Sequence, residues 1–302
     1  MHNLKKLHCV GYSGINQHGI KRLTNISKLC CDFNEKITNV NALQNIKELG
    51  CCGDSGIDQN GIKYLSNLIK LDCDSNEKIT DINHLSRIKK LICCENSGIN
   101  QNGIKNLTKL ILLNCCNNKK IKDVNHLSNL KELNCYDNSG INQNGIKNLT
   151  KIIKINCSNN EKITDVNHFS NLKDLQCCRD SGIDQNGIKN LTKIIKLNCN
   201  NNKKINDVNH LSNLERLDCC GFSGIDQKGI QFLNKISNLD CDDNAKINDV
   251  NHLSNLERLD CCGFSGIDQN GIKDLSKITR LYMNDNDKIG DVTHLRNIKY
   301  LY

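Results

Sequence analysis

Cysteine is the residue type in this chain with the widest chemical repertoire, because thiolates bind metals, form disulfides and act as nucleophiles. The 302 residues include twenty cysteines. Thirteen of them recur at alternating spacings of 22 and 20 residues, and the next position in that series is Met283. A position that accepts methionine is an apolar packing position, where free cysteine behaves as a small hydrophobe. We therefore expect these thirteen to be buried and reduced, as in a cytoplasmic protein. They are Cys9, Cys31, Cys51, Cys73, Cys93, Cys115, Cys135, Cys157, Cys177, Cys199, Cys219, Cys241 and Cys261.

Six other cysteines directly follow members of that series, and we name them the second cysteine row. They are Cys52, Cys94, Cys116, Cys178, Cys220 and Cys262. Adjacent residues of a strand point to opposite faces, so we expect the second row on an exposed face. Most of its members fall on alternate strands, about 10 Å apart, which is too far for a disulfide or a shared zinc ion. Cys94 and Cys116 lie on neighbouring strands and are the exception. We expect inert surface thiols and no metal, while a redox role stays open.

Histidine and glycine also recur with the repeat. His84, His126, His168, His210, His252 and His294 lie 42 residues apart, so we expect turn-stabilising hydrogen bonds and not a shared metal. Glycine pairs such as Gly56 and Gly61 resemble phosphate-binding loops only superficially, and we interpret them as bends that need unusual backbone angles. No P-loop, Ser/His/Asp set or carboxylate dyad stands apart from the repeat. We therefore expect no enzyme and no cofactor.

A half-unit L-x-x-L-x-C-x-x-N-x-x-I must position all these side chains. Its first copy begins at Leu4, and fourteen copies follow one another at spacings that alternate between 22 and 20 residues, before a fifteenth copy cut short at Ile298–Tyr302. So strict a period predicts a solenoid of stacked units. We number the places of each half-unit from its first apolar residue, so that the buried cysteine is place 6.

Each part of the half-unit predicts a local structure. Alternation at places 4 and 6 predicts a short strand with one buried face, paired in parallel with the next. The asparagine at place 9, as in Asn76, Asn96 or Asn138, can bond backbone groups that the turn leaves unpaired. In the 22-residue unit, Asn or Asp before Q-N-G-I predicts an N-cap and one or two helical turns. The 20-residue unit is too short for a regular helix and predicts a 3-10 or turn segment.

These motifs resemble leucine-rich repeats, with Cys in place of a third Leu. The 20-residue unit, such as Ile163–Leu172, is similar to the internalin-like class, and the 22-residue unit resembles cysteine-containing repeats. The resemblance implies an α/β leucine-rich-repeat solenoid, a curved right-handed coil. Its parallel sheet would line the concave face, with short helices and 3-10 turns on the convex face. We expect one domain over residues 1–302, of about fourteen repeats plus the truncated one, without separate caps. The family implies a protein-binding surface and no catalytic residues.

The C-terminal third carries the candidate partner-binding residues, which the repeat places on the concave face. An arginine row at place 3 lies beside an aspartate row at place 5, edged by aromatics. The candidates are Arg216, Asp218, Asp240, Asp242, Arg258, Asp260, Arg280, Tyr282, Phe222 and Phe264. Arginine and aromatic residues are typical anchors of protein interfaces. The alternative is that cross-strand Arg–Asp pairs only neutralise each other, because the patch lies in a near-verbatim duplication of residues 207–230 as 249–272.

Charge and hydropathy limit the classes of partner that we expect for this chain. The net charge of +8 is spread along the chain, and no apolar run approaches the roughly 20 residues that span a membrane. Lysines at regular spacings, such as Lys78, Lys120 and Lys246, could contact phosphates. Nearby aspartates such as Asp81 would weaken the positive electrostatic field of these lysines, so we expect no nucleic-acid partner. Both ends of the chain consist of repeat sequence, and end-to-end self-association is therefore the alternative to a protein-binding scaffold.

Overall fold

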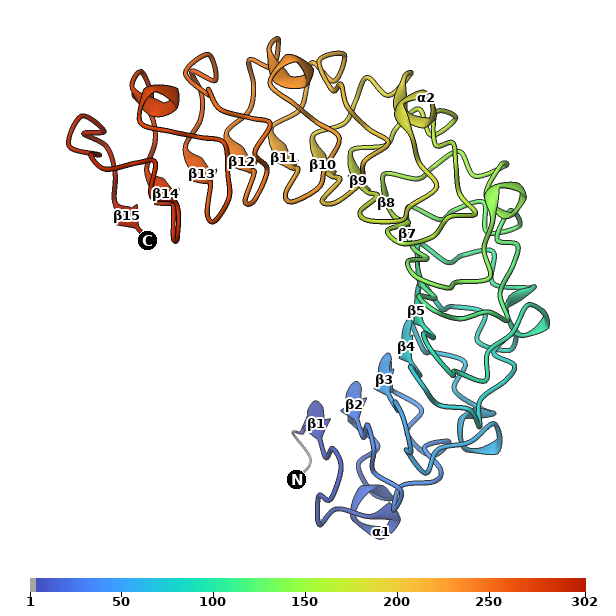
Figure 1. The fold of residues 1–302 in the computed structure, drawn as a ribbon. Coiled ribbons are helices and arrows are strands. Elements are labelled where there is room, and N and C mark those ends of the chain that lie inside the picture. The colour runs from blue at the N-terminus through green and yellow to red at the C-terminus, as the bar shows by residue number, and fades with distance from the viewer. Residues whose placement is uncertain (1–3) are drawn as a thin grey trace. The chain divides into compact units, whose positions relative to one another are not determined.

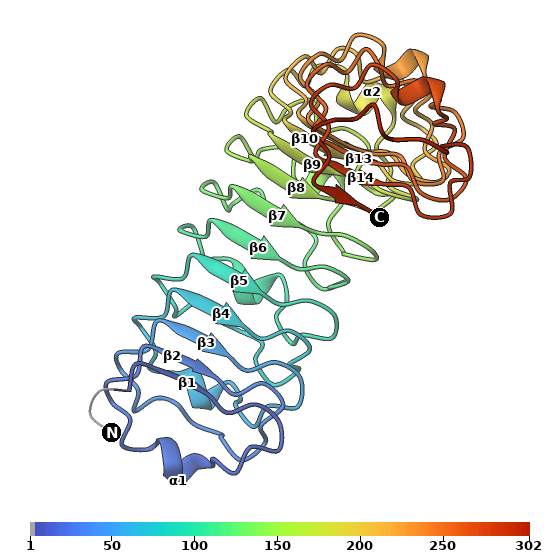
Figure 2. The same ribbon diagram turned by 90° about the vertical axis from the view of Figure 1, so that its left-hand side faces the viewer.

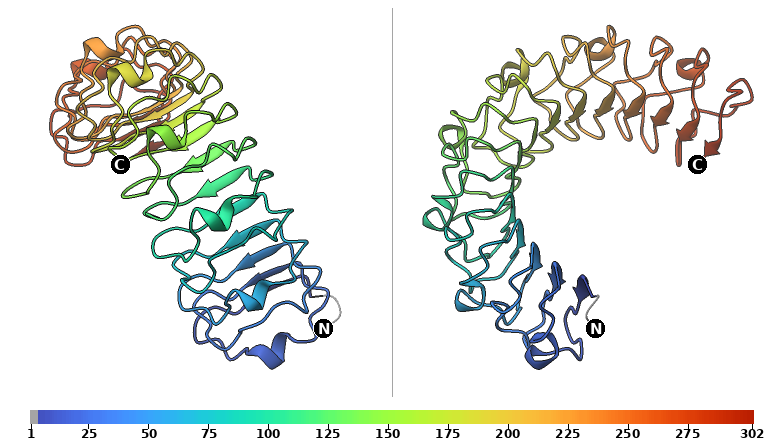
Figure 3. Two further views of the ribbon diagram at one scale, coloured as in Figure 1. Left: turned by 90° about the vertical axis from the view of Figure 1, so that its right-hand side faces the viewer. Right: turned by 180° about the vertical axis from the view of Figure 1, so that it is seen from behind.

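The computed structural model describes residues 4–302 and divides into two compact units, Met1–Ile152 and Ile153–Tyr302. In each unit short strands follow one another along one side, and the helical turns lie on the opposite side (Figures 1 and 2). Further views show the same two layers within each unit (Figure 3). We describe each unit by itself, and the expected single domain over 1–302 stays a prediction.

The strands match the predicted half-units. The first unit contains β1 (Lys6–His8), β2 (Lys28–Cys30), β3 (Glu48–Gly50), β4 (Lys70–Asp72), β5 (Lys90–Ile92), β6 (Leu112–Asn114) and β7 (Glu132–Asn134). The second contains β8 (Lys154–Asn156), β9 (Asp174–Gln176), β10 (Lys196–Asn198), β11 (Arg216–Asp218), β12 (Asn238–Asp240), β13 (Arg258–Asp260), β14 (Arg280–Tyr282) and β15 (Tyr300–Leu301). Within each unit, successive strands pair in parallel and in register, for example Leu217 with Leu239, and Leu239 with Leu259. We name the side that carries places 3, 5 and 7 the sheet face.

The core lies directly behind the strands. The apolar residues of places 1, 4 and 6 form continuous buried rows, and all thirteen cysteines at place 6 are at most 1% exposed. Several of these thiols donate a hydrogen bond to the next strand, as Cys31 does to the Gly50 carbonyl at 3.3 Å. The prediction that place 6 is an apolar core position is confirmed.

Buried asparagines close the turn after each strand of the 20-residue units. The Asn76 amide donates to the carbonyls of Cys51 (2.8 Å) and Ile57 (3.1 Å), while its oxygen accepts from the Lys78 backbone. The same prediction is wrong for Asn96 and Asn138, which are exposed. In the 22-residue units the inward position falls one residue later, on a serine. The buried serines are Ser55, Ser97, Ser139, Ser181, Ser223 and Ser265.

The 22-residue units form the predicted capped helical turns. These are α1 (Gln17–Ile20), η1 (Asn60–Ile62), η2 (Asn102–Ile104), η3 (Gln143–Gly145), α2 (Gln185–Ile188), η4 (Lys228–Ile230) and η5 (Asn270–Ile272). The Asp184 carboxylate caps α2 by accepting from the Gly187 N–H at 3.0 Å. The glutamine after the cap joins neighbouring units. Gln227 accepts from the backbones of Asn248 and Asp249 and donates to the Asp249 carbonyl.

The 20-residue units form turns, as predicted. Six of these units carry a histidine, which reaches the preceding unit, as His252 Nε2 does when it donates to the Ile230 carbonyl at 3.1 Å. His84, His126, His210 and His294 make the corresponding bond. The predicted turn-stabilising role of the histidines is therefore confirmed for these five.

The expected reason for the paired glycines is wrong. Gly56, Gly61, Gly182 and Gly187 do not have positive φ angles. Glycine is needed there because a Cβ would strike the preceding repeat, for instance at 2.3 Å from the Glu35 carbonyl oxygen in the case of Gly56. The left-handed conformation lies instead at place 8. Gly11, Gly53, Gly221, Gly263 and ten non-glycine residues, Asn201 and Asp243 among them, have φ between 53° and 60°.

Candidate functional site

The predicted partner-binding residues gather on the sheet face of the second unit. Arg216, Arg258 and Arg280 occupy place 3 of β11, β13 and β14, and Asp218, Asp240 and Asp260 occupy place 5 of β11, β12 and β13. Strand register brings the three aspartates side by side. Phe222 and Phe264 lie apart from them, in the turns after β11 and β13, where they are largely exposed.

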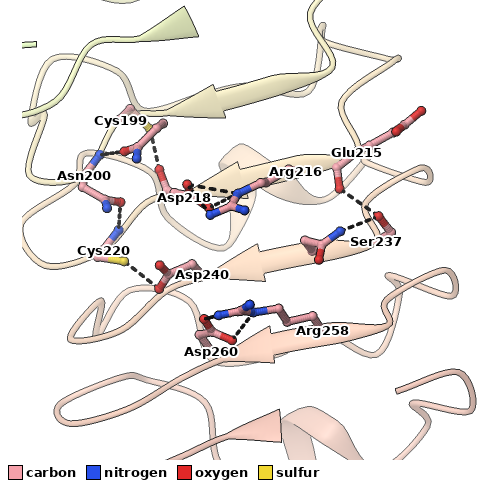
Figure 4. A network of polar contacts seen from close by, with 12 residues as sticks. Cys199, Asn200, Glu215, Arg216, Asp218, Cys220, Ser237, Asp240, Arg258 and Asp260 are labelled. Carbon is pink, nitrogen blue, oxygen red and sulfur yellow. Dashed lines mark hydrogen bonds and ion pairs between the residues drawn. The ribbon is translucent and has the colours of Figure 1, made fainter. Parts of the chain in front are cut away.

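Two of the arginines pair with an aspartate of their own strand. Arg216 Nε lies 3.0 Å from Asp218 Oδ1, and Arg258 Nη2 lies 2.6 Å from Asp260 Oδ2. Figure 4 shows each guanidinium turned toward the carboxylate two residues along its strand. The expected alternative of cross-strand pairs is therefore wrong for these residues. Places 3 and 5 point to the same face, and an arginine side chain is long enough to cover the distance between them.

The carboxylates lie beneath their arginines. Asp218 and Asp260 are only 7% and 8% exposed, whereas Arg216 is exposed. The hydrogen bond to Asp218 raises the pKa of Arg216, and Asp260 does the same for Arg258. A molecule approaching this face therefore meets guanidinium groups before it meets these two carboxylates.

Asp240 differs from its two neighbours because place 3 of its own strand is Asn238. It lies between the two ion pairs in Figure 4 and accepts the S–H of Cys220 at 2.7 Å. Burial raises the pKa of Asp240, and the Cys220 hydrogen bond partly offsets that effect. The sequence signal for this contact is a cysteine at place 7 followed by an aspartate at place 5 of the next strand, which also brings Cys52 to Asp72.

Aromatic rings extend the site toward the last strands. The Arg258 guanidinium lies 4.7 Å from the centroid of the Tyr282 ring, and Tyr282 stacks on Tyr302 at 4.8 Å. A guanidinium above an aromatic face is attracted by the ring quadrupole. Asp242, at place 7, accepts the backbone N–H of Cys262 at 2.6 Å and so stabilises the next strand.

A shallow hollow that sequence reasoning missed adjoins the arginine row. It has a volume of about 290 Å³ and lies over β9, β10 and β11. Its polar lining consists of Asp174, Gln176, Lys196, Asn198, Arg216 and Asp218. Lys154, on the neighbouring β8, pairs with Asp174 at 3.1 Å.

The second cysteine row is not the exposed row that was expected. Cys94 and Cys116 are buried, and the other four are half-buried. Thiols of this row donate to polar groups on the next strand, as Cys52 does to Asp72 (3.1 Å) and Cys178 to Asn198 (2.8 Å). A cysteine at place 7 can reach the side chain at place 5 of the following strand, because both lie on the sheet face.

The regularly spaced lysines that include Lys78, Lys120 and Lys246 are structural. Lys78, Lys120, Lys204, Lys246 and Lys288 each donate to the carbonyl of a buried serine in the preceding unit, at 2.7–3.0 Å. These ammonium groups are held against the backbone, which reduces their reach toward a phosphate.

Metal and membrane sites were also sought within residues 4–302. No group of three or more His, Cys, Asp or Glu side chains in this part of the chain has the arrangement of a metal site. The helices described above are all too short to cross a bilayer.

Similar structures identify the fold. No protein-family model matches the sequence, and no curated protein matches it significantly. An internalin, InlF from Listeria monocytogenes, is 20% identical with a TM-score of 0.64, over 99% of this chain and 87% of that one. The functional domain of InlJ from the same organism, described as including a cysteine ladder, is 20% identical with a TM-score of 0.53, over 98% and 72%. TLR13 in its complex with ssRNA13 is 15% identical with a TM-score of 0.60, over 100% and 54%.

These similarities and the repeated parallel strands show that the chain has the leucine-rich-repeat fold, as the sequence motifs predicted. Sequence identities of 15–20% extend to the fold and not to a particular activity.

Proposed function

We propose that the chain is a non-enzymatic scaffold that binds a protein partner on the sheet face of β11–β14. The observation that carries this proposal is the fixed position of Arg216 and Arg258, each held by a buried carboxylate, with Tyr282 against the second guanidinium. Arginine and tyrosine are enriched at interface hot spots. Side chains that are already ordered lose little conformational entropy on docking.

The partner surface that fits this face is acidic. Because Asp218 and Asp260 are buried under their arginines, the guanidinium edges and the tyrosine ring are accessible, next to the half-buried Asp240 and Asp242. Carboxylates of a partner can accept two parallel hydrogen bonds from one guanidinium. A cytoplasmic, reducing location belongs to the same proposal, and the continuous row of buried thiols at place 6 supports it.

The leucine-rich-repeat fold supports the general class. Its neighbours include an internalin and TLR13 solved in a complex with ssRNA13, so this fold is compatible with binding a macromolecule. The lysine contacts with serine carbonyls in this chain favour a protein over a nucleic acid as the partner.

An affinity capture from host lysate tests the proposal. We expect the wild-type chain to retain a partner, and the variant with Arg216, Arg258 and Arg280 changed to Glu to lose it. Arg280→Glu alone is the milder variant, because Arg280 has no ion pair among the described residues. The matched control changes Lys6, Lys70 and Lys90 to Glu, at the same place on β1, β4 and β5.

Circular dichroism of each variant separates lost binding from lost folding. Capture that survives in the folded triple variant would contradict the proposed face. If nuclease treatment abolishes the capture, the result would contradict a protein partner. If the immobilised chain retains only further copies of itself, the result would indicate self-association instead.

A further inference from the structure

Cys94 and Cys116 are the two members of the second cysteine row that lie on neighbouring strands. They follow β5 and β6 at the same place, and the parallel ladder continues past them. The Cys93 N–H donates to the Asn114 carbonyl and the Glu95 N–H to the Cys116 carbonyl, both at 2.9 Å. Paired strands lie about 4.8 Å apart, which is within the range of Cα separations found across disulfides.

The two side chains contact each other and not the polar groups that hold the rest of the row. The Cys94 thiol hydrogen-bonds to Cys116, and the Tyr136 hydroxyl of the following repeat also hydrogen-bonds to Cys116. By contrast, Cys52, Cys178 and Cys220 donate to a carboxylate or an amide. Cys94 and Tyr136 are therefore the neighbours that interact with the sulfur of Cys116.

These contacts distinguish the two sulfurs chemically. The hydrogen bond from Cys94, aided by the one from Tyr136, lowers the pKa of Cys116 against the effect of burial and of Asp74 and Glu95. The same contact raises the pKa of Cys94, and the charge of Cys116 raises the pKa of Tyr136 to about 12. Of the two sulfurs, Cys116 is therefore the one whose ionisation its neighbours favour.

We propose that Cys94 and Cys116 are a modification site, a dithiol that a peroxide converts reversibly into a disulfide joining two adjacent repeats. Cys116 is 6% exposed on the sheet face and Cys94 is 3% exposed. So little accessible area favours an oxidant the size of hydrogen peroxide over a bulky disulfide reagent. The cysteines at place 6 are also neighbours across strands, but they lie in the core, at most 1% exposed.

The oxidation follows in two balanced steps. The Cys116 thiolate attacks one peroxide oxygen, the O–O bond breaks, and the departing hydroxide takes up a proton to leave as water, giving a sulfenic acid. The Cys94 sulfur then attacks the sulfenic sulfur, an S–S bond forms, the S–O bond breaks, and the Cys94 proton leaves with the hydroxyl as a second water. A small dithiol such as dithiothreitol returns both thiols by exchange.

Peptide mapping of the peroxide-treated full chain tests the proposal. We expect a mass loss of about 2 Da per chain, the loss of two hydrogens in the steps above. After free thiols are blocked, a linked pair of tryptic peptides should carry Cys94 and Cys116, and dithiothreitol should abolish the link. Each of these peptides also holds a place 6 cysteine, so Cys94→Ser and Cys116→Ser identify the sulfurs, and both should lose the link.

Cys178→Ser is the matched control and should keep the link, because Cys178 lies at the same place but the adjacent strands carry Ser158 and Asn200 there. Link formation in wild type should be at least tenfold faster than oxidation of Cys178. A folded wild-type chain that gives no linked peptide, or equal oxidation of Cys178, would overturn the proposal. A link that persists in Cys94→Ser would assign it to the place 6 cysteines and overturn the proposal as well.

Discussion

At the scale of single residues, asparagine contributes more to this fold than its polarity suggests. Asn76 is fully buried and makes three hydrogen bonds, two as donor and one as acceptor. Asn118, Asn202, Asn244 and Asn286 make the same set of contacts one or more double repeats further on. Each therefore satisfies backbone groups that would otherwise be buried without a partner.

Replacement of Asn76 by Ala should destabilise the protein by about 2–4 kcal/mol, because two carbonyls and one N–H lose their partner inside the core. Urea unfolding followed by circular dichroism measures the change. Asn67→Ala is the control, since half-buried Asn67 only donates to the Gln44 carbonyl and accepts from Arg87 in solvent-exposed contacts, and it should cost less than about 1 kcal/mol. Equal effects of the two substitutions would contradict the role assigned to Asn76.

Residue identity alone predicted some of these roles and missed others. Asparagine at place 9 is a turn residue by its chemistry, and this was right wherever the unit has 20 residues. It failed at Asn96 and Asn138, because the longer turn shifts the inward position by one residue, to Ser97 and Ser139. The pairing of Arg216 with Asp218 also escaped prediction. Same-strand and cross-strand partners lie at similar distances, and only coordinates distinguish them.

At the scale of elements, close approach between successive repeats decides which residues are tolerated. The helical turn α2 contains Gly187, whose missing Cβ would lie 2.3 Å from the Thr164 carbonyl oxygen. The Gln185 side chain bonds to the neighbour on the other side, at Asn206 and Asp207 of the following unit. The single-turn helices are therefore held by their neighbours and not by their own length.

Gly187→Ala should destabilise the protein by about 1–3 kcal/mol, the usual cost of overpacking. An isolated helix would show the opposite sign, because alanine is favoured over glycine by about 1 kcal/mol. Thermal unfolding reports the difference. In Gly290→Ala the new Cβ meets no atom within 4 Å, so that variant should be neutral or slightly more stable. A stabilised Gly187→Ala would show that the carbonyl contact is absent.

The secondary-structure elements were predictable from the sequence. Apolar residues with a period of two at places 4 and 6 indicate a strand. In the Asp-Gln-Asn-Gly segment, the aspartate caps the helical turn that follows it. The left-handed residue at place 8 was not predicted. Gly, Asn and Asp are common there, but Phe33, Glu95 and Arg179 adopt the same conformation. At those three positions the repeat geometry overrides the local preference of the side chain.

At the scale of the whole molecule, the strict period was sufficient to predict the solenoid, and it was not sufficient to predict a binding site. Every repeat offers the same scaffold, so function depends on departures from the pattern. Asn238 in the arginine row and the adjacent Cys94 and Cys116 are such departures. Their significance became visible once the structure showed Asp240 between two ion pairs and the Cys94 thiol against Cys116.

The hydrogen bonds between repeats have a consequence for chain length. Side chains that join neighbouring units bond to residues that lie 19 to 25 positions away in the sequence, as Asn244 does to Ile225 and Cys219. Removing residues 207–248 joins Asn206 to Asp249 and restores nearly the same sequence, because residues 249–272 duplicate 207–230 except at Lys228 and Asn270.

We expect that deletion to fold with the same circular dichroism per residue and a similar melting temperature, since each junction contact is formed again by an identical residue. Removal of residues 207–238 is the control, because it breaks the register and should unfold the second unit. Cooperative unfolding of both variants at the same temperature would contradict this expectation. Recombination can therefore lengthen or shorten this protein in steps of one double repeat, and the contacts between neighbouring repeats need no change.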